Sequence, residues 1–309
     1  MRNFRSILAK NYLRVSATLQ DPLSSGPVLA VSRAIYGNTA GFRQNLYGQV
    51  DALRVRLSCR LIPNPDYAVP ARELAEHGIT RLPGQYPPAL VAAIGQKIEQ
   101  QRGQRDEHDG GAESAPYKEV IEDVAQRIPE LFGLVDERVT AILESYYRGY
   151  FQVHNVVCWR IHHAPRNVTD KREVFSNRWH CDSSPTSAVS LFVIPSDVTP
   201  EDGPMHVLNR QRTRLLLRSG FNSRSDYGVS HYVLEDPSHI SKLEGSAGTA
   251  WLISTPHCFH RASIPAPGRR RDIIRIDLAP STRPVGHDEI VPAKIYDIVH
   301  RAKRRRIQT

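Results

Sequence analysis

Two residue types that bind metal ions stand two positions apart in the segment Arg178-Trp179-His180-Cys181-Asp182. In an extended strand, His180 and Asp182 leave the same face, while Cys181 points to the other face. An imidazole and a short carboxylate that converge on one point are two of the three ligands of a facial triad for non-haem Fe(II), and the third would be a distant His. Because the chain contains 13 His, one His-x-Asp pattern can arise by chance. A surface strand with two polar residues is the alternative interpretation.

A possible third ligand lies near the C-terminal end, where residues 248–262 read as a Gly turn, an apolar strand and an exit that carries His257 and His260. A strand that ends in His is where a β-rich core could bring a remote ligand beside the first pair. After the turn at 265–268, the Arg-rich run 269–278 enters a further strand. An Arg at that position offers a planar, permanently charged fork suited to a carboxylate. The order His-x-Asp, long gap, His and then Arg is much rarer by chance than its parts.

The rest of the sequence indicates helices first and strands afterwards. Up to about residue 70 we expect one short helix, then connectors and the alternating run 53–57. Next, the spacing predicts a helix over 72–77 ended by Gly78, a short strand over 79–82 and a helix opened by Pro87. A mobile loop is expected over 101–115, followed by helices over 117–127 and 135–147. The remaining elements are strands over 151–161, 187–194, 231–234, 249–254 and 272–278. Helices packed before a run of short antiparallel strands predict an α+β fold with a β-sandwich or jelly-roll core.

The composition is that of a globular protein, with 309 residues, 40% hydrophobic and 24% charged. No run of about eighteen or more apolar residues is present, so we expect no conventional membrane span. The four Cys form no CxxC pair. This usage suits the reducing cytoplasm and argues against a disulfide scaffold or a Cys-rich zinc site.

The formal net charge of +9 could indicate nucleic acid, an anionic membrane or an acidic substrate as partner. Much of the excess lies at the two ends, in residues 1–19 and 301–306. Such runs are usually solvated, so nucleic-acid contact is the less favoured interpretation. Apolar residues from Phe4 to Val15 follow helical spacing, which favours a docked amphipathic helix over an organelle transit peptide.

Taken together, the chain resembles the Fe(II)/2-oxoglutarate-dependent oxygenases, in particular the phytanoyl-CoA dioxygenase-like family. Besides His180 and Asp182, the resemblance rests on three further segments: His260-Arg261-Ala262, the Gly-Pro turn that leads into a strand at 201–208, and the strand-helix opening at 76–82. It covers roughly residues 71–280. The resemblance implies a double-stranded β-helix (jelly-roll, cupin-like) core over 151–283 with helices over 71–150. Residues 1–70 would then be an N-terminal extension packed on this core, and 284–309 a basic C-terminal helix or tail.

The same resemblance implies His180, Asp182 and His260 as Fe(II) ligands, with Arg271 pairing with the distal carboxylate of 2-oxoglutarate. Arg269 and Arg270 are loop alternatives, and Arg275 lies on the same strand face as Arg271. The family often has Ser or Thr two residues after this Arg, whereas Ile273 stands here, so a hydroxyl must come from another strand. The family's Pro-Gly-Ser-His turn is also replaced, by residues 209–212. In relatives that loop borders the substrate.

Several residues near these motifs have competing interpretations. His257 and His260 are three residues apart and cannot both point inward from an extended strand. His260 is preferred because the residues that follow it match the resemblance better. Cys181 and Cys258 should face away as buried spectators. Trp179 is expected in the core. Asn155 and Arg160 are expected to make structural hydrogen bonds, and the adjacent pair His162-His163 should bind no metal.

The expected activity is that of a cytoplasmic dioxygenase that uses Fe(II), 2-oxoglutarate and O2 to hydroxylate a small metabolite, neutral or anionic, and releases succinate and CO2. The presence of Asp182 argues against the halogenating relatives, which replace that carboxylate by a small residue. A cupin-like metal- or ligand-binding protein without redox chemistry is one alternative, and an oxygenase that acts on nucleic acid is another. The oligomeric state cannot be predicted from this sequence.

Overall fold

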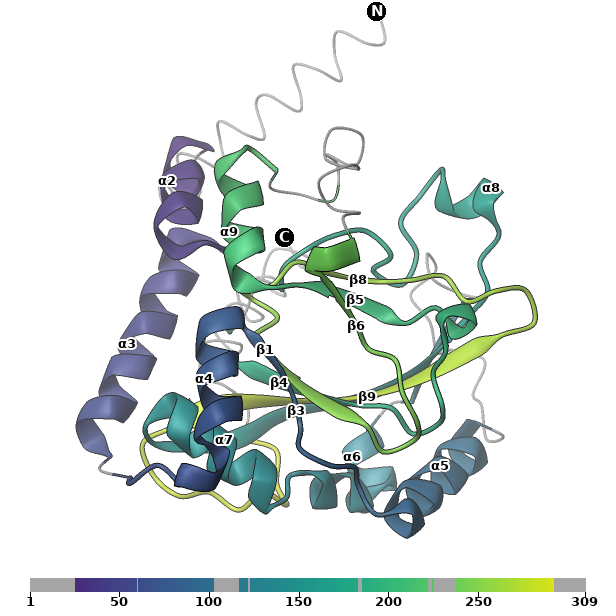
Figure 1. Ribbon diagram of the computed structural model, residues 1–309, viewed down its shortest axis with the longest axis horizontal. Helices are drawn as coiled ribbons and strands as arrows, with labels where there is room; N and C mark the ends of the chain where they lie inside the picture. Colours follow the sequence, from purple (N-terminus) through teal and green to yellow (C-terminus); the bar gives the residue numbers. More distant parts are fainter. Residues whose placement is uncertain are drawn as a thin grey trace, which may run out of the picture.

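The computed structural model describes residues 26–59, 61–102, 117–121, 123–182, 185–221, 224 and 237–291. Two antiparallel sheets face each other, and helices cover the outer face of the larger sheet (Figure 1). Within the described ranges, no helix is long and apolar enough to cross a bilayer. The antiparallel sheets and the separate helices make an α+β fold, as the sequence predicts.

The helices are α2 (Gly26–Tyr36), α3 (Phe42–Ser58), α4 (Ala68–His77), α5 (Pro88–Arg102), α6 (Val124–Arg127), α7 (Glu137–Tyr147), α8 (Arg166–Thr169) and α9 (Arg210–Arg218). The strands are β1 (Ile79–Arg81), β2 (Lys118–Ile121), β3 (Tyr150–His162), β4 (Val189–Val193), β5 (Met205–Leu208), β6 (Ile240–Lys242), β7 (Ala250–Ile253), β8 (His260–Ala262) and β9 (Arg270–Ser281). Short 3₁₀ turns occur at 65–67, 129–134, 200–202 and 237–239.

The larger sheet has the strand order β1-β7-β4-β9-β3-β2, and the smaller sheet has the order β6-β5-β8. The long strands β3 and β9 pair along almost their whole length, with a register shift between Val153 and Asn155. Because side chains alternate along a strand, every second residue of β9 from Arg271 onward faces the space between the sheets. This strand therefore presents a row of side chains to any site that lies there.

Two apolar clusters fix the layers. One buries residues of α4, α5 and α7 against the outer face of the larger sheet, including Leu74, Ile94 and Ile142. The other lies between the two sheets and includes Phe192 of the larger sheet and Val207 of the smaller one. Burial of this apolar surface, at about 25 cal/mol per Å², is the main force that holds the sheets together.

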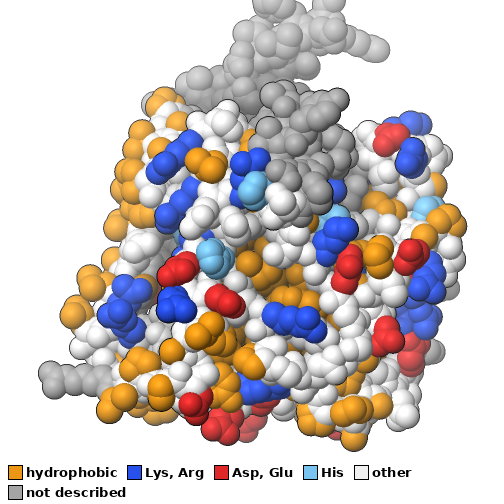
Figure 2. Space-filling view, viewed as in Figure 1, with side chains coloured by type: hydrophobic (Ala, Val, Ile, Leu, Met, Phe, Trp, Pro, Cys, Tyr) orange, Lys and Arg blue, Asp and Glu red, His pale blue; other side chains and the backbone are white. Residues whose placement is uncertain are grey.

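The N-terminal part differs from the prediction of one short helix followed by connectors, because α2 and α3 are both well formed. The alternating run 53–57 is the last part of α3 and not an extended segment. Helix α3 packs on α7 and β9, and α2 packs on α9. Figure 2 shows hydrophobic side chains along the edge that these two helices form. The exposed ones are Val31 and Ile35 on α2 and Leu46, Tyr47, Val50, Leu53 and Leu57 on α3.

One further prediction is wrong. The segment 117–127 was expected to be one helix, but residues 118–121 form β2 and only 124–127 are helical. Pairing of β2 with β3 and burial of Ile121 override a spacing that also fits a helix. The substitute turn at 209–212 opens helix α9, because the Asn209 side chain caps it by accepting a hydrogen bond from the Arg212 N–H at 2.8 Å.

The other predicted elements of the core are confirmed within a few residues, namely α4, β1, α5, α7, β3, β4, β7 and β9. Gly78 ends α4 in the left-handed conformation with φ 76°, as expected for a helix stop. The strand predicted at 231–234, most of the loop predicted at 101–115, the helix of residues 4–15 and the basic run 301–306 lie outside the described residues.

Candidate metal centre

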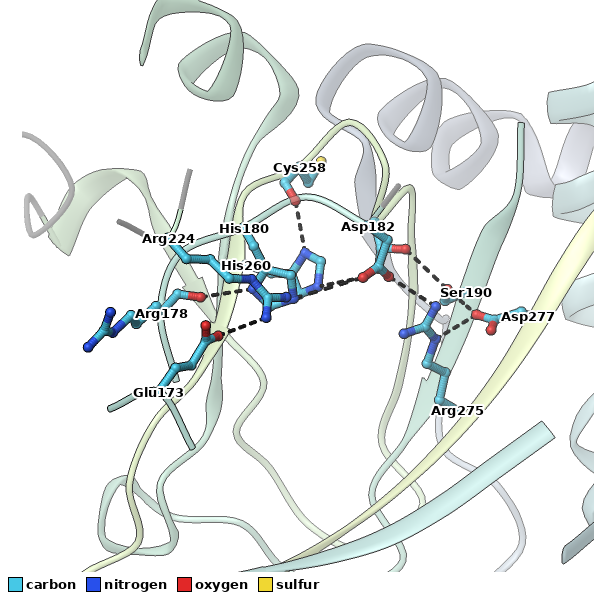
Figure 3. Close-up of polar contacts among 11 residues, drawn as sticks. Glu173, Arg178, His180, Asp182, Ser190, Arg224, Cys258, His260, Arg275 and Asp277 are labelled. Atoms are coloured by element: carbon cyan, nitrogen blue, oxygen red, sulfur yellow. Dashed lines mark hydrogen bonds and ion pairs between the residues drawn. The ribbon is translucent and has the colours of Figure 1, made fainter. Parts of the chain in front are cut away.

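The side chains of His180, Asp182 and His260 meet beside the smaller sheet (Figure 3). The backbone N–H groups of His180 and His260 each donate to the carbonyl oxygen of the other, at 3.1 and 2.9 Å. In such an antiparallel pair both side chains leave the same face, and the two ring centroids are 4.3 Å apart. Asp182 is held by its own N–H, which donates to the Thr255 carbonyl at 3.2 Å. One possible ligand atom from each of the three residues lies within 4.8 Å of the others.

Backbone carbonyls set the tautomer of both imidazoles. His180 Nδ1 lies 2.8 Å from the Arg178 carbonyl oxygen, and His260 Nδ1 lies 3.0 Å from the Cys258 carbonyl oxygen. A carbonyl only accepts, so each Nδ1 carries the proton and each Nε2 keeps a lone pair. The two Nε2 atoms lie 3.8 and 3.7 Å from Asp182 Oδ1. This is the arrangement in which outer hydrogen bonds orient histidine ligands of a metal ion.

Burial sets the protonation states of the three groups. It lowers the pKa of His180 to about 3, and it also lowers the pKa of His260. Burial alone would raise the pKa of Asp182, but the Arg275 guanidinium, followed by the two imidazoles, holds it well below its usual range. At neutral pH the cluster therefore has two neutral imidazoles and one carboxylate, which are the forms that bind a metal ion.

Arg275 on β9 occupies the second oxygen of Asp182. Its Nη2 lies 3.0 Å from Asp182 Oδ2, and its Nε donates to Asp277 Oδ1 at 2.6 Å. Asp277 also accepts from Ser190 Oγ at 2.5 Å (Figure 3) and from Asn155 Nδ2 at 3.0 Å. This network across β3, β9 and β4 fixes Arg275, so that Oδ1 of Asp182 alone faces the two imidazoles.

The three residues line a cavity of about 340 Å³ between the sheets, and Arg271 lines the same cavity. Arg271 is 2% exposed, and none of its three guanidinium nitrogens has a hydrogen-bond partner in the described part of the chain. Burial lowers its pKa to about 9, with Asp202 acting in the opposite direction. A buried cation without a partner is costly, so this position has the chemistry of a site for an anion.

The remaining walls of this cavity combine apolar and polar groups. Trp159 and Phe192 are among the apolar walls, and Lys118 Nζ lies 4.9 Å from the centre of the Trp159 ring. Ser176 is the hydroxyl-bearing residue among the described lining residues. Phe175 and Ser176 both have positive φ, 36° and 63°. Such strained backbone often accompanies functional sites.

The competing residues take other places. His257 does not join the cluster, because its ring lines a separate cavity and its Nε2 donates to the Thr186 carbonyl at 3.1 Å. Cys181 lies in an apolar cluster with Trp179 and Phe259, and Cys258 is also buried. The cysteines therefore have the spectator position that the strand pattern predicts.

The polar residues weighed as structural do make structural bonds. Arg160 binds Asp272, with its Nε donating to Oδ1 at 2.8 Å, and also pairs with Glu99. The pair His162-His163 diverges as expected: His162 Nε2 lies 2.7 Å from Glu119 Oε1, whereas His163 Nδ1 donates to the Pro265 carbonyl at 2.7 Å.

Sequence reasoning missed the role of Arg275 and Asp277. The signal was present, because alternation along β9 places residues 271, 273, 275 and 277 on one face and all four line the cavity. The sequence does not predict which of the two arginines, Arg271 or Arg275, reaches the Asp182 carboxylate. That depends on the distance from each position of β9 to Asp182.

Comparisons with known proteins place this geometry in context. The sequence matches no family model and no curated protein. Among solved structures, the chain is similar to SnoN, a non-heme alpha ketoglutarate dependent epimerase from nogalamycin biosynthesis, as determined in complex with Fe3+, alpha ketoglutarate and nogalamycin RO. The two are 14% identical, the match covers 74% of this chain and 91% of SnoN, and the TM-score is 0.54. EctD from S. alaskensis in its apoform is 15% identical over 76% of this chain and 85% of its own, with a TM-score of 0.51. The chain therefore shares the fold of SnoN and EctD.

Proposed function

We propose that this protein is an Fe(II)- and 2-oxoglutarate-dependent dioxygenase of the phytanoyl-CoA dioxygenase-like family. The reaction would join 2-oxoglutarate, O2 and a substrate C–H group to give a hydroxylated product, succinate and CO2. The observation that carries the proposal is that one cavity is lined both by a His-Asp-His ligand set and by a buried arginine that has no hydrogen-bond partner among the described residues. The fold shared with SnoN, whose structure contains Fe3+ and alpha ketoglutarate, supports it.

The ligand set fits the metal. Two neutral imidazole nitrogens and one carboxylate oxygen are the donors of the facial triad of Fe(II) oxygenases. His180, Asp182 and His260 would hold the ion, and the bound iron would supply the O2-dependent oxidation. Arg275 keeps the second oxygen of Asp182 engaged, so the carboxylate offers one ligand atom. The Arg178 and Cys258 carbonyls keep the Nε2 lone pairs directed toward the same point.

Arg271 fits the cosubstrate. Its guanidinium is buried and has no hydrogen-bond partner among the described residues, and a carboxylate of 2-oxoglutarate would supply two parallel charge-assisted hydrogen bonds. Ile273 leaves no hydroxyl at the position where the family often has one, and Ser176 is the replacement that the described cavity walls offer. The β3–β9 register pairs Arg271 with Ile161, and the Arg271 side chain lines the cavity.

A small metabolite is the proposed substrate. The cavity is about 340 Å³ and also has to hold 2-oxoglutarate, which leaves room for a modest substrate group at the metal. Trp159 and Phe192 would exclude water from the reacting carbon, while Lys118 favours an anionic substrate; Arg224 is paired with Glu173 at 2.9 Å. Hydroxylation is the proposed outcome, and the carboxylate of Asp182 argues against halogenation.

The same proposal extends to the architecture. The two facing sheets would form the double-stranded β-helix (jelly-roll) core over 151–283, with helices over 71–150, the extension 1–70 and the basic tail 284–309. The four buried cysteines form no disulfide, which suits a cytoplasmic enzyme.

A cupin-like protein that binds a metal ion without redox chemistry is the alternative from another class. The unpartnered Arg271 disfavours it, because a site that takes no 2-oxo acid has no use for a buried cation there. An oxygenase acting on nucleic acid is less favoured, since it would need a continuous basic groove with stacking aromatic residues.

Calorimetric titration separates these candidates. Mn(II), a redox-silent stand-in for Fe(II), should bind the wild type with one site, and 2-oxoglutarate should then bind the Mn(II)-loaded protein. Asp182→Ala should remove metal binding, whereas Asp197→Ala, which changes an exposed aspartate outside the cluster, serves as the control. A protein that binds Mn(II) but not 2-oxoglutarate would favour the cupin-like alternative, and one that binds neither would refute both.

A further inference from the structure

A second cavity lies on the other side of the loops that carry the candidate metal ligands. Its volume is about 570 Å³, and we call it the helical cavity because residues of α2, α3, α7 and the first turns of α9 line it. It also contains Thr186 and Ser187 from the loop after Asp182, and His257 from the loop before His260. A volume in this range is typical of small-molecule sites.

The charged groups around the helical cavity have one sign. Arg56 of α3 and Arg210 and Arg214 of α9 line it, and no Asp or Glu is among its described lining residues. Neither Arg56 nor Arg214 forms an ion pair within the described ranges, and the hydrogen bonds of Arg210 go to uncharged groups, the Ala75 carbonyl at 2.6 Å and the Tyr146 hydroxyl at 3.3 Å. Three guanidinium groups around one cavity make a positive potential that attracts an anion.

Local structure holds these cations in place. The chain turns through Gly37 with φ 66°, and the stem of Arg214 lies so close that an added Cβ at Gly37 would be 2.6 Å from Arg214 Cγ. Arg210 is anchored by the end of α4 and by α7 through its two hydrogen bonds. Burial, followed by the charge of Arg210, lowers the pKa of His257 to about 4. His257 is thus neutral at pH 7 and its Nε2–H is engaged by Thr186.

Apolar side chains of α2 and α3 also line the cavity. Ile35 of α2 and Val50 and Leu53 of α3 line the cavity, and all three remain more than half exposed. Helix α3 is fixed against the floor because Thr186 Oγ1 donates to the Gln44 carbonyl at 3.1 Å. The cavity therefore offers a positive side and an apolar side, joined by a polar floor.

We propose that the helical cavity binds a small molecule that carries a carboxylate or phosphate group on an apolar body. The anionic group pairs with Arg214, Arg210 and Arg56, and the body packs against α2 and α3. Such a ligand contacts both the Thr186 and the His257 loops, which lead to Asp182 and His260. The site is separate from the Arg271 cavity and does not depend on the proposed oxygenase activity.

Calorimetric titration of the full chain with three probes tests this site. Phenyl phosphate and benzoate carry an anion on a ring, while benzyl alcohol carries the ring alone. We expect both anions to bind, and benzyl alcohol to bind at least tenfold more weakly. Arg214→Gln and Arg56→Gln should each weaken phenyl phosphate binding about fivefold, in line with partly exposed ion pairs. Both side chains are exposed, so the fold should tolerate these changes.

Arg218→Gln is the matched control, because Arg218 is exposed on α9 one turn beyond Arg214 and does not line the cavity. Arg271→Met identifies binding at the other anion site. The proposal is overturned if no anion binds at millimolar concentration, if benzyl alcohol binds as well as phenyl phosphate, or if Arg218→Gln weakens binding as much as Arg214→Gln does. If Arg271→Met loses anion binding while Arg214→Gln and Arg56→Gln bind fully, the anion lies in the Arg271 cavity, and the proposal is again overturned.

Discussion

Replacing Arg271 by Met should stabilise the protein while it removes 2-oxoglutarate binding. Burial lowers the pKa of Arg271 to about 9, well below the ordinary value of an arginine. One pKa unit corresponds to about 1.4 kcal/mol, so a lowering of this size corresponds to about 5 kcal/mol, which is an upper bound for the penalty of keeping this cation folded without a partner among the described residues. The pKa is lower in the folded state, so the penalty is fully present below pH 9 and is relieved only as the pH rises above 9 toward the ordinary pKa of an arginine.

Met has a similar length and no charge, so it should recover part of this penalty. Replacement of buried charged groups by apolar ones of similar volume stabilises proteins by up to a few kcal/mol, and we expect about 2 kcal/mol for Arg271→Met at pH 7.5. Urea denaturation monitored by circular dichroism measures the change. In the wild type, 2-oxoglutarate with Mn(II) should raise the midpoint further, and in Arg271→Met it should not.

Arg275→Met is the matched control, because Arg275 stands on the same strand and the same face. Here the cation is paired with Asp182 and Asp277, and its removal leaves the buried Asp277 without its guanidinium partner. Loss of one member of a buried pair typically costs about 3 kcal/mol or more, so this variant should be less stable than the wild type. If Arg271→Met is instead destabilised by more than about 1 kcal/mol, or still binds 2-oxoglutarate, the assignment of Arg271 is wrong.

Three other outcomes follow from the geometry. The pKa of His257 in the folded state, about 4, lies below the ordinary value of 6.5, so its contribution to stability is complete above pH 6.5 and is lost as the pH falls to 4. Over this pH range the wild type should lose up to about 3 kcal/mol more unfolding free energy than His257→Gln. Urea titrations at pH 7 and pH 4 measure this loss, and equal losses in the two proteins would exclude that role. Gly78 and Gly268 both have φ 76°, but an added Cβ would overlap Cys258 Sγ at Gly78, whereas it would meet nothing within 4 Å at Gly268. Thermal denaturation should therefore show a loss of stability of about 3 kcal/mol for Gly78→Ala and of about 1 kcal/mol for Gly268→Ala. Similar losses in the two variants would mean that the overlap at Gly78 relaxes freely. Mn(II) at one hundred times its Kd should raise the unfolding free energy by about 2.7 kcal/mol, EDTA should reverse this, and a metal effect that persists in Asp182→Ala would place the ion elsewhere.

The candidate site could be predicted from the sequence to a large extent, because its parts are local patterns. His180 and Asp182 are spaced for one strand face, and the exit of the strand after Gly248 supplies His260. The structure brings these three together and leaves His257 elsewhere. The ion pair between Arg275 and Asp182 was beyond reach, since it joins residues that are far apart in the sequence and depends on the register of β9.

The fold was predictable where one pattern dominated. Strand β3 and helix α7 have clear periods and were predicted within a few residues. Strand β2 was not, because its apolar residues also fit a helix and only pairing with β3 decides the conformation. Helix α3 was missed because the run 53–57 alternates like a strand, although Leu46, Val50, Leu53 and Leu57 also follow helical spacing.

An anaerobic titration of the apoprotein with Fe(II) and then 2-oxoglutarate tests the central claim most directly. The account predicts a visible charge-transfer absorption band that appears only when both are present, since the 2-oxo acid has to reach the iron held by His180, Asp182 and His260. The band should be absent in Asp182→Ala, and in Arg271→Met it should require far more 2-oxoglutarate. A wild-type protein that binds Fe(II) tightly and develops no band with saturating 2-oxoglutarate would contradict the account.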